Sequence, residues 1–213
     1  SHGNVVHLGE RDCSLQRRHQ KILEEAPSPV LPAEHRNEIG QRVTTAIQAL
    51  GYRGAGTVEF LYADGAFYFI EMNTRLQVEH PVTEMITGID IVQQQIRIAA
   101  GENLSFTQQD IQLKGWSIEA RIYAEDPLRN FLPSSGRLIR YSHPREDDTL
   151  RVDTGVSEGG EISIHYDPMI AKVSTWGSDR DQAIRRMADA LSSYEIAGIS
   201  PWRRSRPSWL PGL

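Results

Sequence analysis

The chain has 213 residues, of which 39% are hydrophobic and 24% are charged, a composition typical of soluble globular domains. This length allows one large domain or two small ones with a substantial core. A formal net charge of -5 argues against a general nucleic-acid binder, and no apolar run is long enough to predict a membrane span. One cysteine, Cys13, cannot form an internal disulfide, so we expect a reducing compartment.

The first fifty residues predict a strand and then a helix, separated by a charged segment. Residues 4–8 form a short apolar run that is typical of a strand. Between Pro32 and Gly51, apolar side chains recur at the spacing of one helix face, at Ile39, Val43, Ile47 and Leu50. Proline suits the first turn of a helix and glycine its end, so both boundaries agree with this interpretation.

Residues 56–73, GTVEFLYADGAFYFIEMN, predict a β-hairpin around Asp64 and Gly65. A loop of three residues (64–66) or of five places Glu59 opposite Glu71, whereas a two-residue turn places Glu59 opposite Ile70. We expect the longer loop, because it gathers one set of side chains on one face: Glu59, Leu61, Phe67, Phe69 and Glu71.

The stretch that follows, EMNTRLQVE, alternates polar and apolar residues from Glu71 to Glu79. Because side chains on a strand point alternately to opposite faces, we expect a strand with one polar face. That face would carry Glu71, Asn73, Arg75, Gln77 and Glu79.

The rest of the chain predicts helices at 89–102 and 178–196 and strands at 115–126 and 160–177. In the first of these strands, Ile118, Ala120 and Ile122 alternate with Glu119, Arg121 and Tyr123. Pro168 divides the second strand region, Ser178 or Asp179 caps the last helix, and Ile184, Met187 and Leu191 face inward. The mixture predicts an α+β fold with a domain boundary between Gly101 and Gly115. Residues 200–213 show no period, and we expect them to be disordered or poorly packed.

Two carboxylates directly opposite each other on a hairpin lie roughly 5 Å apart and repel each other. A cation between Glu59 and Glu71, with Asn73 beside them, would remove that cost, and such oxygen ligands suit Mg²⁺ or Mn²⁺ holding the phosphates of a nucleotide. The alternative is two solvated acids on an exposed face. In the same way, Arg75 offers a planar fork for an anion and Glu79 a general base, unless both belong to an ion-paired surface.

Three other motifs favour ordinary explanations when taken alone. The segment from Gln16 to Lys21, QRRHQK, is more typical of a charged edge strand than of a nucleotide site. Arg121 shares a face with Glu119 and would form a surface ion pair. The glycines of GYRGAG, residues 51–56, end a helix and enter a strand, which is the reverse of a dinucleotide-binding fingerprint.

The strings RDCSLQRRHQKILEEAPSP, GYRGAGTVEFLYADGAFYFIEMNTRLQVEHPVTEMITGIDIV and EARIYAEDPLRNFLPSSGRL resemble the biotin carboxylases, the ATP-grasp ligases of biotin-dependent carboxylases. The resemblance extends from Gly3 to Ile199. Within the family it is to the α subunits of propionyl-CoA and acetyl-CoA carboxylases, and the propionyl-CoA carboxylase α subunit is the expected one. It implies the C-terminal half of an ATP-grasp domain at 1–113, the biotin carboxylase C-terminal domain, an antiparallel sheet with helices, at 114–199, and a tail outside the family at 200–213.

The resemblance also implies roles for single residues. Glu59 and Glu71, helped by Asn73, would hold Mg²⁺ or Mn²⁺ on the phosphates of ATP, and Gln16, His19, Leu61 and Glu71 would contact the nucleotide. Arg75, Gln77 and the backbone of Val78 would bind bicarbonate, Glu79 would deprotonate it, and Arg121 would stabilise the biotin enolate. Bicarbonate would attack ATP to give carboxyphosphate, which would supply CO₂ to biotin.

The partners implied are bicarbonate, a biotin carboxyl carrier domain, a second copy in a homodimer and a carboxyltransferase subunit, with no nucleic acid and no membrane. The expected location is cytoplasmic. The family's N-terminal part with its glycine-rich lid is not in the sequence, so we expect this chain alone to be inactive. Two alternatives stay open: a non-catalytic folding or dimerisation fragment, or the corresponding part of an acetyl-CoA, methylcrotonyl-CoA or pyruvate carboxylase.

Overall fold

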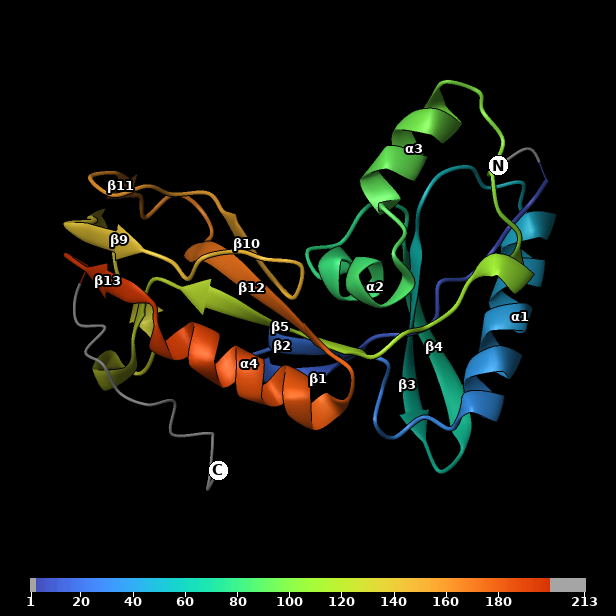
Figure 1. Ribbon diagram of the computed structural model, residues 1–213, viewed down its shortest axis with the longest axis horizontal. Helices are drawn as coiled ribbons and strands as arrows, with labels where there is room; N and C mark the ends of the chain where they lie inside the picture. Colours follow the sequence, from blue (N-terminus) through green and yellow to red (C-terminus); the bar gives the residue numbers. More distant parts are fainter. Residues whose placement is uncertain (1–2, 200–213) are drawn as a thin grey trace. The chain divides into compact units, whose positions relative to one another are not determined.

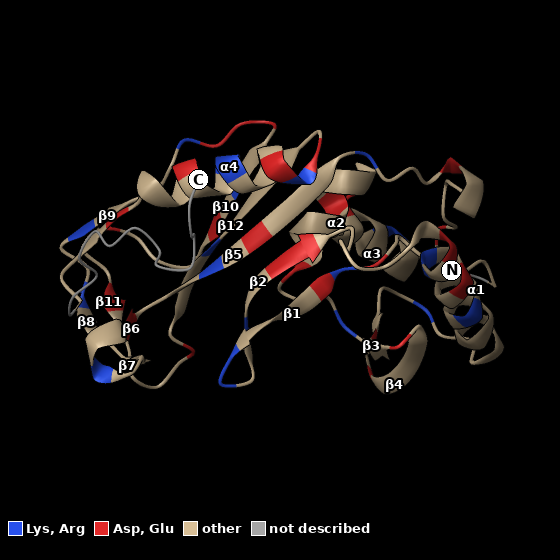
Figure 2. Ribbon diagram, turned by 90° about the horizontal axis from the view of Figure 1, so that it is seen from below, with Lys and Arg blue, Asp and Glu red and all other residues tan. Residues whose placement is uncertain are grey.

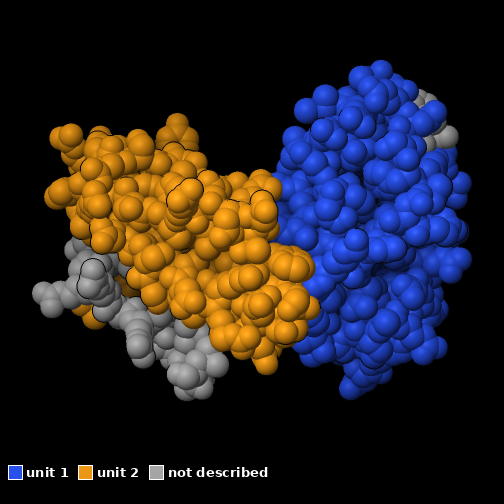
Figure 3. All heavy atoms as spheres, in the orientation of Figure 1, with its two compact units in different colours: residues 1–12, 25–117 blue, residues 13–24, 118–213 orange. Residues whose placement is uncertain are grey.

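The computed structural model describes residues 3–199, which divide into two compact units (Figure 3). Unit 1 comprises Ser1–Asp12 and Glu25–Ser117, and unit 2 comprises Cys13–Glu24 and Ile118–Leu213. The division falls within three strands, β1 (Asp12–Arg17), β2 (Gln20–Ala26) and β5 (Trp116–Tyr123). The expected disorder of 200–213 concerns residues outside those that the structure describes.

Unit 1 combines a hairpin, β3 (Thr57–Ala63) with β4 (Ala66–Asn73), and the helix α1 (Ala33–Ala49), which lies beside it in Figure 1. The predicted helix is confirmed, since Pro32 is its N-cap and Gly51 follows its end with a φ of 64°. A hydrogen bond of 2.8 Å between His35 Nδ1 and the Tyr62 hydroxyl joins the helix to the hairpin. The predicted apolar face is half-buried, except that Leu50 is exposed.

Two further helices complete this unit, α2 (His80–Thr87) and α3 (Ile91–Ala99), followed by the 3-10 turn η1 (Gln108–Asp110). The helix α3 agrees with the prediction, and the Asp90 side chain caps it by accepting from the Gln93 amide at 2.7 Å. The sequence did not predict α2, whose Val82 and Ile86 are almost completely buried.

The strand predicted at residues 4–8 is absent from the structure. The backbone of His7 forms hydrogen bonds with a side chain and not with a strand. The His7 amide donates to Gln108 Oε1 at 2.8 Å, and the His7 carbonyl accepts from Gln108 Nε2 at 3.0 Å. The glutamine amide satisfies the same backbone groups that a neighbouring strand would satisfy, so an apolar run here needs no sheet.

Unit 2 is built on a five-stranded sheet with the order β1-β2-β5-β12-β10, where β12 is Met169–Gly177 and β10 is Leu150–Thr154. The helix α4 (Arg180–Ser192) runs along β12 in Figure 1, and the Thr175 hydroxyl donates to the Ala183 carbonyl at 3.1 Å. Asp179 caps α4, as predicted, by accepting from the Gln182 amide. Met187 and Leu191 are buried as expected, whereas Ala183 rather than Ile184 is completely buried.

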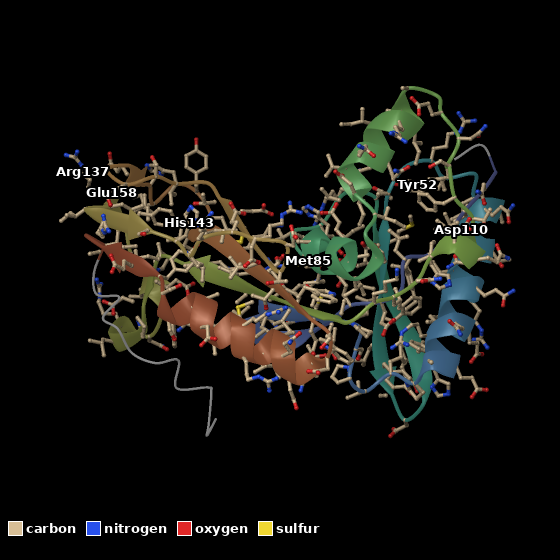
Figure 4. All side chains as sticks on the ribbon, viewed as in Figure 1. Tyr52, Met85, Asp110, Arg137, His143 and Glu158 are labelled. Atoms are coloured by element: carbon tan, nitrogen blue, oxygen red, sulfur yellow. The ribbon has the colours of Figure 1, made fainter. Side chains whose placement is uncertain are left out.

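Short strand pairs form the remainder of unit 2. They are β11 (Glu161–Ile162) with β8 (Gly136–Arg137), β13 (Glu195–Ala197) with β9 (Arg140–Ser142), and β6 (Glu125–Asp126) with β7 (Leu132–Pro133), and η2 (Pro127–Arg129) is a 3-10 turn. Figure 4 shows Arg137, His143 and Glu158 at the end that β9 and β11 form.

No helix within residues 3–199 is both long and apolar enough to cross a bilayer.

Between β12 and α4 the backbone passes so close to position 177 that only a glycine should fit there. A Cβ atom there would lie 2.5 Å from the Ala183 amide nitrogen and 2.8 Å from the Asp179 carbonyl oxygen. Gly177→Ala is therefore expected to destabilise the protein by about 1–3 kcal/mol through overpacking. Gly155→Ala is the matched control, because a Cβ at Gly155 meets nothing within 4 Å. Equal thermal unfolding midpoints of the two variants in the full-length protein would contradict this close approach.

Candidate active site

The hairpin places Glu59 directly opposite Glu71, but by a different route from the predicted one. The turn contains only Asp64 and Gly65, which both have positive φ (51° and 78°) as a tight type I′ turn requires. The expected longer loop is therefore wrong. A β-bulge between Glu59 and Phe60 then shifts the register by one residue, and this shift restores the Glu59–Glu71 pair.

The bulge also changes which aromatic side chains share a face. Leu61 pairs with Tyr68, whereas Phe60 pairs with Phe69. The Phe60 ring makes edge contacts with Phe67 and Phe69, with centroids 5.9 and 6.1 Å apart. The predicted grouping of these two phenylalanines with Leu61 and the glutamates is therefore wrong.

The Asn73 amide joins the two carboxylates, and a second amide contacts Glu59. Asn73 Nδ2 donates to Glu59 Oε1 at 3.2 Å and to Glu71 Oε1 at 2.9 Å. Gln77 Nε2 donates to the same Glu59 oxygen at 2.6 Å. Four of the predicted site residues are therefore linked through hydrogen bonds at these carboxylates, and donors stand where two like charges would otherwise repel.

The remainder of the predicted polar row does not lie on a strand. Strand β4 ends at Asn73, and residues 74–79 form a loop that leads into α2. This loop turns Gln77, which is 6% exposed, back toward Glu59. Arg75 is exposed and donates to the Leu76 carbonyl, while Glu79 is buried at the N-cap of α2. Val78 lies in the turn between them.

Arg11, which sequence reasoning missed, holds this loop from its other side. Its guanidinium donates to Gln77 Oε1 at 2.6 Å, to Thr57 Oγ1 at 2.9 Å and to Thr83 Oγ1 at 3.2 Å. These partners belong to the loop, to β3 and to α2. A single arginine in a charged segment carries no periodic signal, so only the tertiary structure could identify it.

The donor set around Glu59 and Glu71 fits a magnesium ion bound together with phosphates. No cluster of three His, Cys, Asp or Glu side chains suited to a metal ion occurs within residues 3–199. Mg²⁺ does not need such a cluster, because it retains water and is usually bound through one or two carboxylates plus the phosphates of the substrate. Two carboxylates that need a positive neighbour, with an amide between them, match that requirement.

The other predicted residues lie elsewhere. Leu61 is 59% exposed on β3 of unit 1. Gln16, His19 and Arg121 belong to unit 2. Gln16 lies on β1, which is an edge strand as expected, and its side chain donates to the Cys13 carbonyl; His19 lies in the β1–β2 turn with a φ of 64°.

Arg121 forms a buried ion pair, not the surface pair with Glu119 that the strand alternation suggested. Its Nε and a terminal nitrogen contact Glu24 Oε1 at 2.7 and 2.6 Å. The Glu24 side chain is completely buried and that of Arg121 is 12% exposed. Glu24 lies on the neighbouring strand β2, so the partner could be recognised only once the strand order was known.

Glu119 lies in the same buried group of charges; Figure 2 shows acidic residues on both β2 and β5. Its Oε2 accepts from the Ser174 hydroxyl at 2.8 Å and lies 4.0 Å from Lys172 Nζ, while its Oε1 has no hydrogen-bond partner within residues 3–199. Burial raises the pKa of Glu119 to about 8, against the opposing effect of Lys172 and with a further contribution from Glu24.

Two family models match the chain. The carbamoyl-phosphate synthase L chain ATP-binding domain matches residues 1–107, and the biotin carboxylase C-terminal domain matches residues 119–202. The propionyl-CoA carboxylase alpha chain of Ruegeria pomeroyi is 56% identical over 220 residues, which cover 93% of this chain and 32% of that protein.

Two other relatives are similarly close. The alpha chain of the mitochondrial methylcrotonoyl-CoA carboxylase of Rattus norvegicus is 55% identical, with 93% of this chain and 28% of that protein covered. A pyruvate carboxylase chain of Methanothermobacter thermautotrophicus is 54% identical, with 92% and 40% covered. The chain thus spans between 28% and 40% of the length of these relatives.

The fold matches a solved structure, the biotin carboxylase domain dimer of Hydrogenobacter thermophilus 2-oxoglutarate carboxylase in complex with MgADP, ADP and bicarbonate. The TM-score is 0.90 at 54% sequence identity, and the match covers 92% of this chain and 44% of that one.

Replacing Glu119 should remove a pH dependence of stability. Because its pKa rises from 4.5 to about 8 on folding, the native state binds more protons than the unfolded state between these values, and stability falls as the pH rises through them. Glu119→Gln has no proton to lose, so its stability relative to the unsubstituted protein should increase from about pH 5 to pH 8 and then level off.

The measurement is the thermal unfolding midpoint of the full-length protein across this pH range. Glu161→Gln is the control, because Glu161 is an exposed acid of the same unit. A difference between Glu119→Gln and the unsubstituted protein that stays constant with pH would show that the native carboxyl is not protonated in this range.

Proposed function

This chain belongs to the biotin carboxylase family, and we propose that it serves the ATP-dependent carboxylation of biotin by bicarbonate, through carboxyphosphate. The observation that carries the proposal is the hydrogen-bonded group that Glu59 and Glu71 form with Asn73 and Gln77. The activity is proposed for the full-length protein, since the relatives are longer than this chain.

We assign the hairpin end of the site to the nucleotide. Glu59 and Glu71, with Asn73 between them, would hold Mg²⁺ or Mn²⁺, an assignment supported by their donor set and by the MgADP bound to the Hydrogenobacter relative. The ion would neutralise charge on the phosphates of ATP, which is the main requirement of phosphoryl transfer. Gln16, His19 and Leu61 are assigned to the nucleotide from the resemblance to the family.

We assign the loop end to bicarbonate. Arg75, the amide of Gln77 and the backbone of Val78 would bind the anion, and Glu79 would take its proton. The bicarbonate oxygen then attacks the γ-phosphorus of ATP, the bond to ADP breaks, and carboxyphosphate forms. The exposure of Arg75 supports its role, because an exposed guanidinium can meet an incoming anion. The position of Glu79 at the N-cap of α2 supports the second role, because it places a carboxylate at the end of the loop that carries Arg75 and Gln77.

Biotin is a substrate of this reaction. Carboxyphosphate decomposes to CO₂ and phosphate, phosphate removes the proton of a ureido nitrogen, and that nitrogen attacks CO₂. Arg121 would stabilise the negative charge on the ureido oxygen, a role supported by its guanidinium being held in one geometry by Glu24.

The proposed partners are a biotin carboxyl carrier domain, a carboxyltransferase and a second copy of the chain, the last supported by the dimer of the Hydrogenobacter relative. The relatives include propionyl-CoA, methylcrotonoyl-CoA and pyruvate carboxylases at similar identity, so their likeness does not select the molecule that finally receives the carboxyl group. A cytoplasmic location stays a prediction, since one of these relatives is mitochondrial.

Glu71→Gln tests the metal end of the site. Loss of one carboxylate charge should weaken Mg-ATP binding by the full-length protein about tenfold or more, measured by titration calorimetry. Glu102→Gln changes an exposed acid of the same unit and is the control. Unchanged binding in Glu71→Gln would favour the alternative that this region is only a folding or dimerisation module.

Glu79→Gln tests the base. The amide keeps the shape of the side chain but cannot accept the proton of bicarbonate, so bicarbonate-dependent ATP hydrolysis should fall by about 10²–10⁴-fold. Mg-ATP binding should be retained, because the role assigned to Glu79 concerns bicarbonate alone. Steady-state hydrolysis with and without bicarbonate is the measurement, and a rate close to that of the unsubstituted enzyme would exclude Glu79 as the base.

A further inference from the structure

Arg11 makes three hydrogen bonds to side chains of three different elements, and none of these partners carries a charge. They are the hydroxyls of Thr57 on β3 and Thr83 on α2, and Gln77 Oε1 in the loop between β4 and α2. One terminal nitrogen, Nη2, serves both Thr57 and Gln77. The three partners are all neutral, so none of them cancels the positive charge of the guanidinium.

The contact with Gln77 fixes the direction of an amide. An amide has an acceptor oxygen at one end and two donor hydrogens at the other. Arg11 can only donate, so Gln77 must turn Oε1 toward Arg11 and Nε2 toward Glu59, where the distance is 2.6 Å. The reversed amide would place donors against the guanidinium and an oxygen against the carboxylate, and both contacts would be repulsive.

Burial stabilises this orientation of the Gln77 amide. Gln77 is 6% exposed and Thr83 is 5% exposed, so little water can replace the contacts with the guanidinium. Hydrogen bonds to charged groups are also stronger than those between neutral groups. The chain of contacts from Arg11 through Gln77 to Glu59 therefore connects the segment before β1 to the carboxylate pair of the hairpin.

We propose that Arg11 is a positioning residue for bicarbonate: it orients the Gln77 amide and adds positive charge behind the loop that binds the anion. This inference rests on the proposed function. Arg11 acts through Gln77, so its loss should affect bicarbonate more than ATP.

The test is a double-mutant cycle between Arg11→Met and Gln77→Ala in the full-length enzyme, read as the KM for bicarbonate in bicarbonate-dependent ATP hydrolysis. Arg11→Met should raise this KM by roughly tenfold, as loss of a charged hydrogen bond predicts. The KM for ATP should increase less than the KM for bicarbonate, because Arg11 contacts Gln77 directly and reaches the proposed metal ligand Glu59 only through it. In the Gln77→Ala background the same change should add less than about twofold, because the two residues act in series.

Two further variants separate positioning from folding. Arg11→Lys keeps the charge, but an ammonium on a flexible stem cannot reproduce the planar fork, so the KM for bicarbonate should still increase. Arg42→Met makes the same side-chain change at an exposed pair with Glu38 and should leave both KM values unchanged.

Independent effects of Arg11→Met and Gln77→Ala, or equal increases in both KM values, would overturn the inference while leaving the proposed function intact. Unsubstituted enzyme without any bicarbonate-dependent hydrolysis would overturn the proposed function and this inference with it.

Discussion

The hydrogen bonds at Glu59 Oε1 are the interactions on which the candidate site depends. This one oxygen accepts from Asn73 on the opposite strand and from Gln77 in the following loop. Without such donors, a second carboxylate across the hairpin would destabilise the strand pair. These hydrogen bonds fix the hairpin and the loop to each other. Side chains on the loop and side chains on the hairpin therefore keep a constant separation. A reaction that joins two substrates requires that constancy.

The register of the hairpin shows how far the sequence predicts this site and where it does not. The predicted pair of Glu59 with Glu71 is confirmed. The longer loop predicted for the hairpin was wrong, because Asp64-Gly65 forms the tight turn that its composition favours. A bulge then shifts the register and restores the pair. A bulge leaves no signal in a single sequence, because it depends on contacts across the sheet.

Other features were unpredictable for a related reason. The alternation from Glu71 to Glu79 looks like a strand, yet Pro81 lies in the first turn of a short helix that begins directly after Glu79. Arg11 is 66 positions from Gln77, and Glu24 is 97 from Arg121. Local periodicity carries no information about partners at such separations. By contrast, α1, α3 and α4 were predicted because their caps and apolar spacing lie within a few residues.

Each unit contains a pair of neighbouring glutamates, and the two pairs differ in how far solvent and ions can reach them. In unit 2, Glu24 and Glu119 are completely buried, and Arg121 and Lys172 neighbour them. The carboxylates of this group already lie beside protein cations, and Glu24 contacts two nitrogens of the Arg121 guanidinium. In unit 1, Glu71 is exposed, and the Asn73 and Gln77 amides that donate to Glu59 are neutral. A cation can therefore approach Glu71 from solvent and would neutralise charge that the neutral amides leave in place. Identical residue types therefore act as scaffold in one unit and as a candidate metal site in the other.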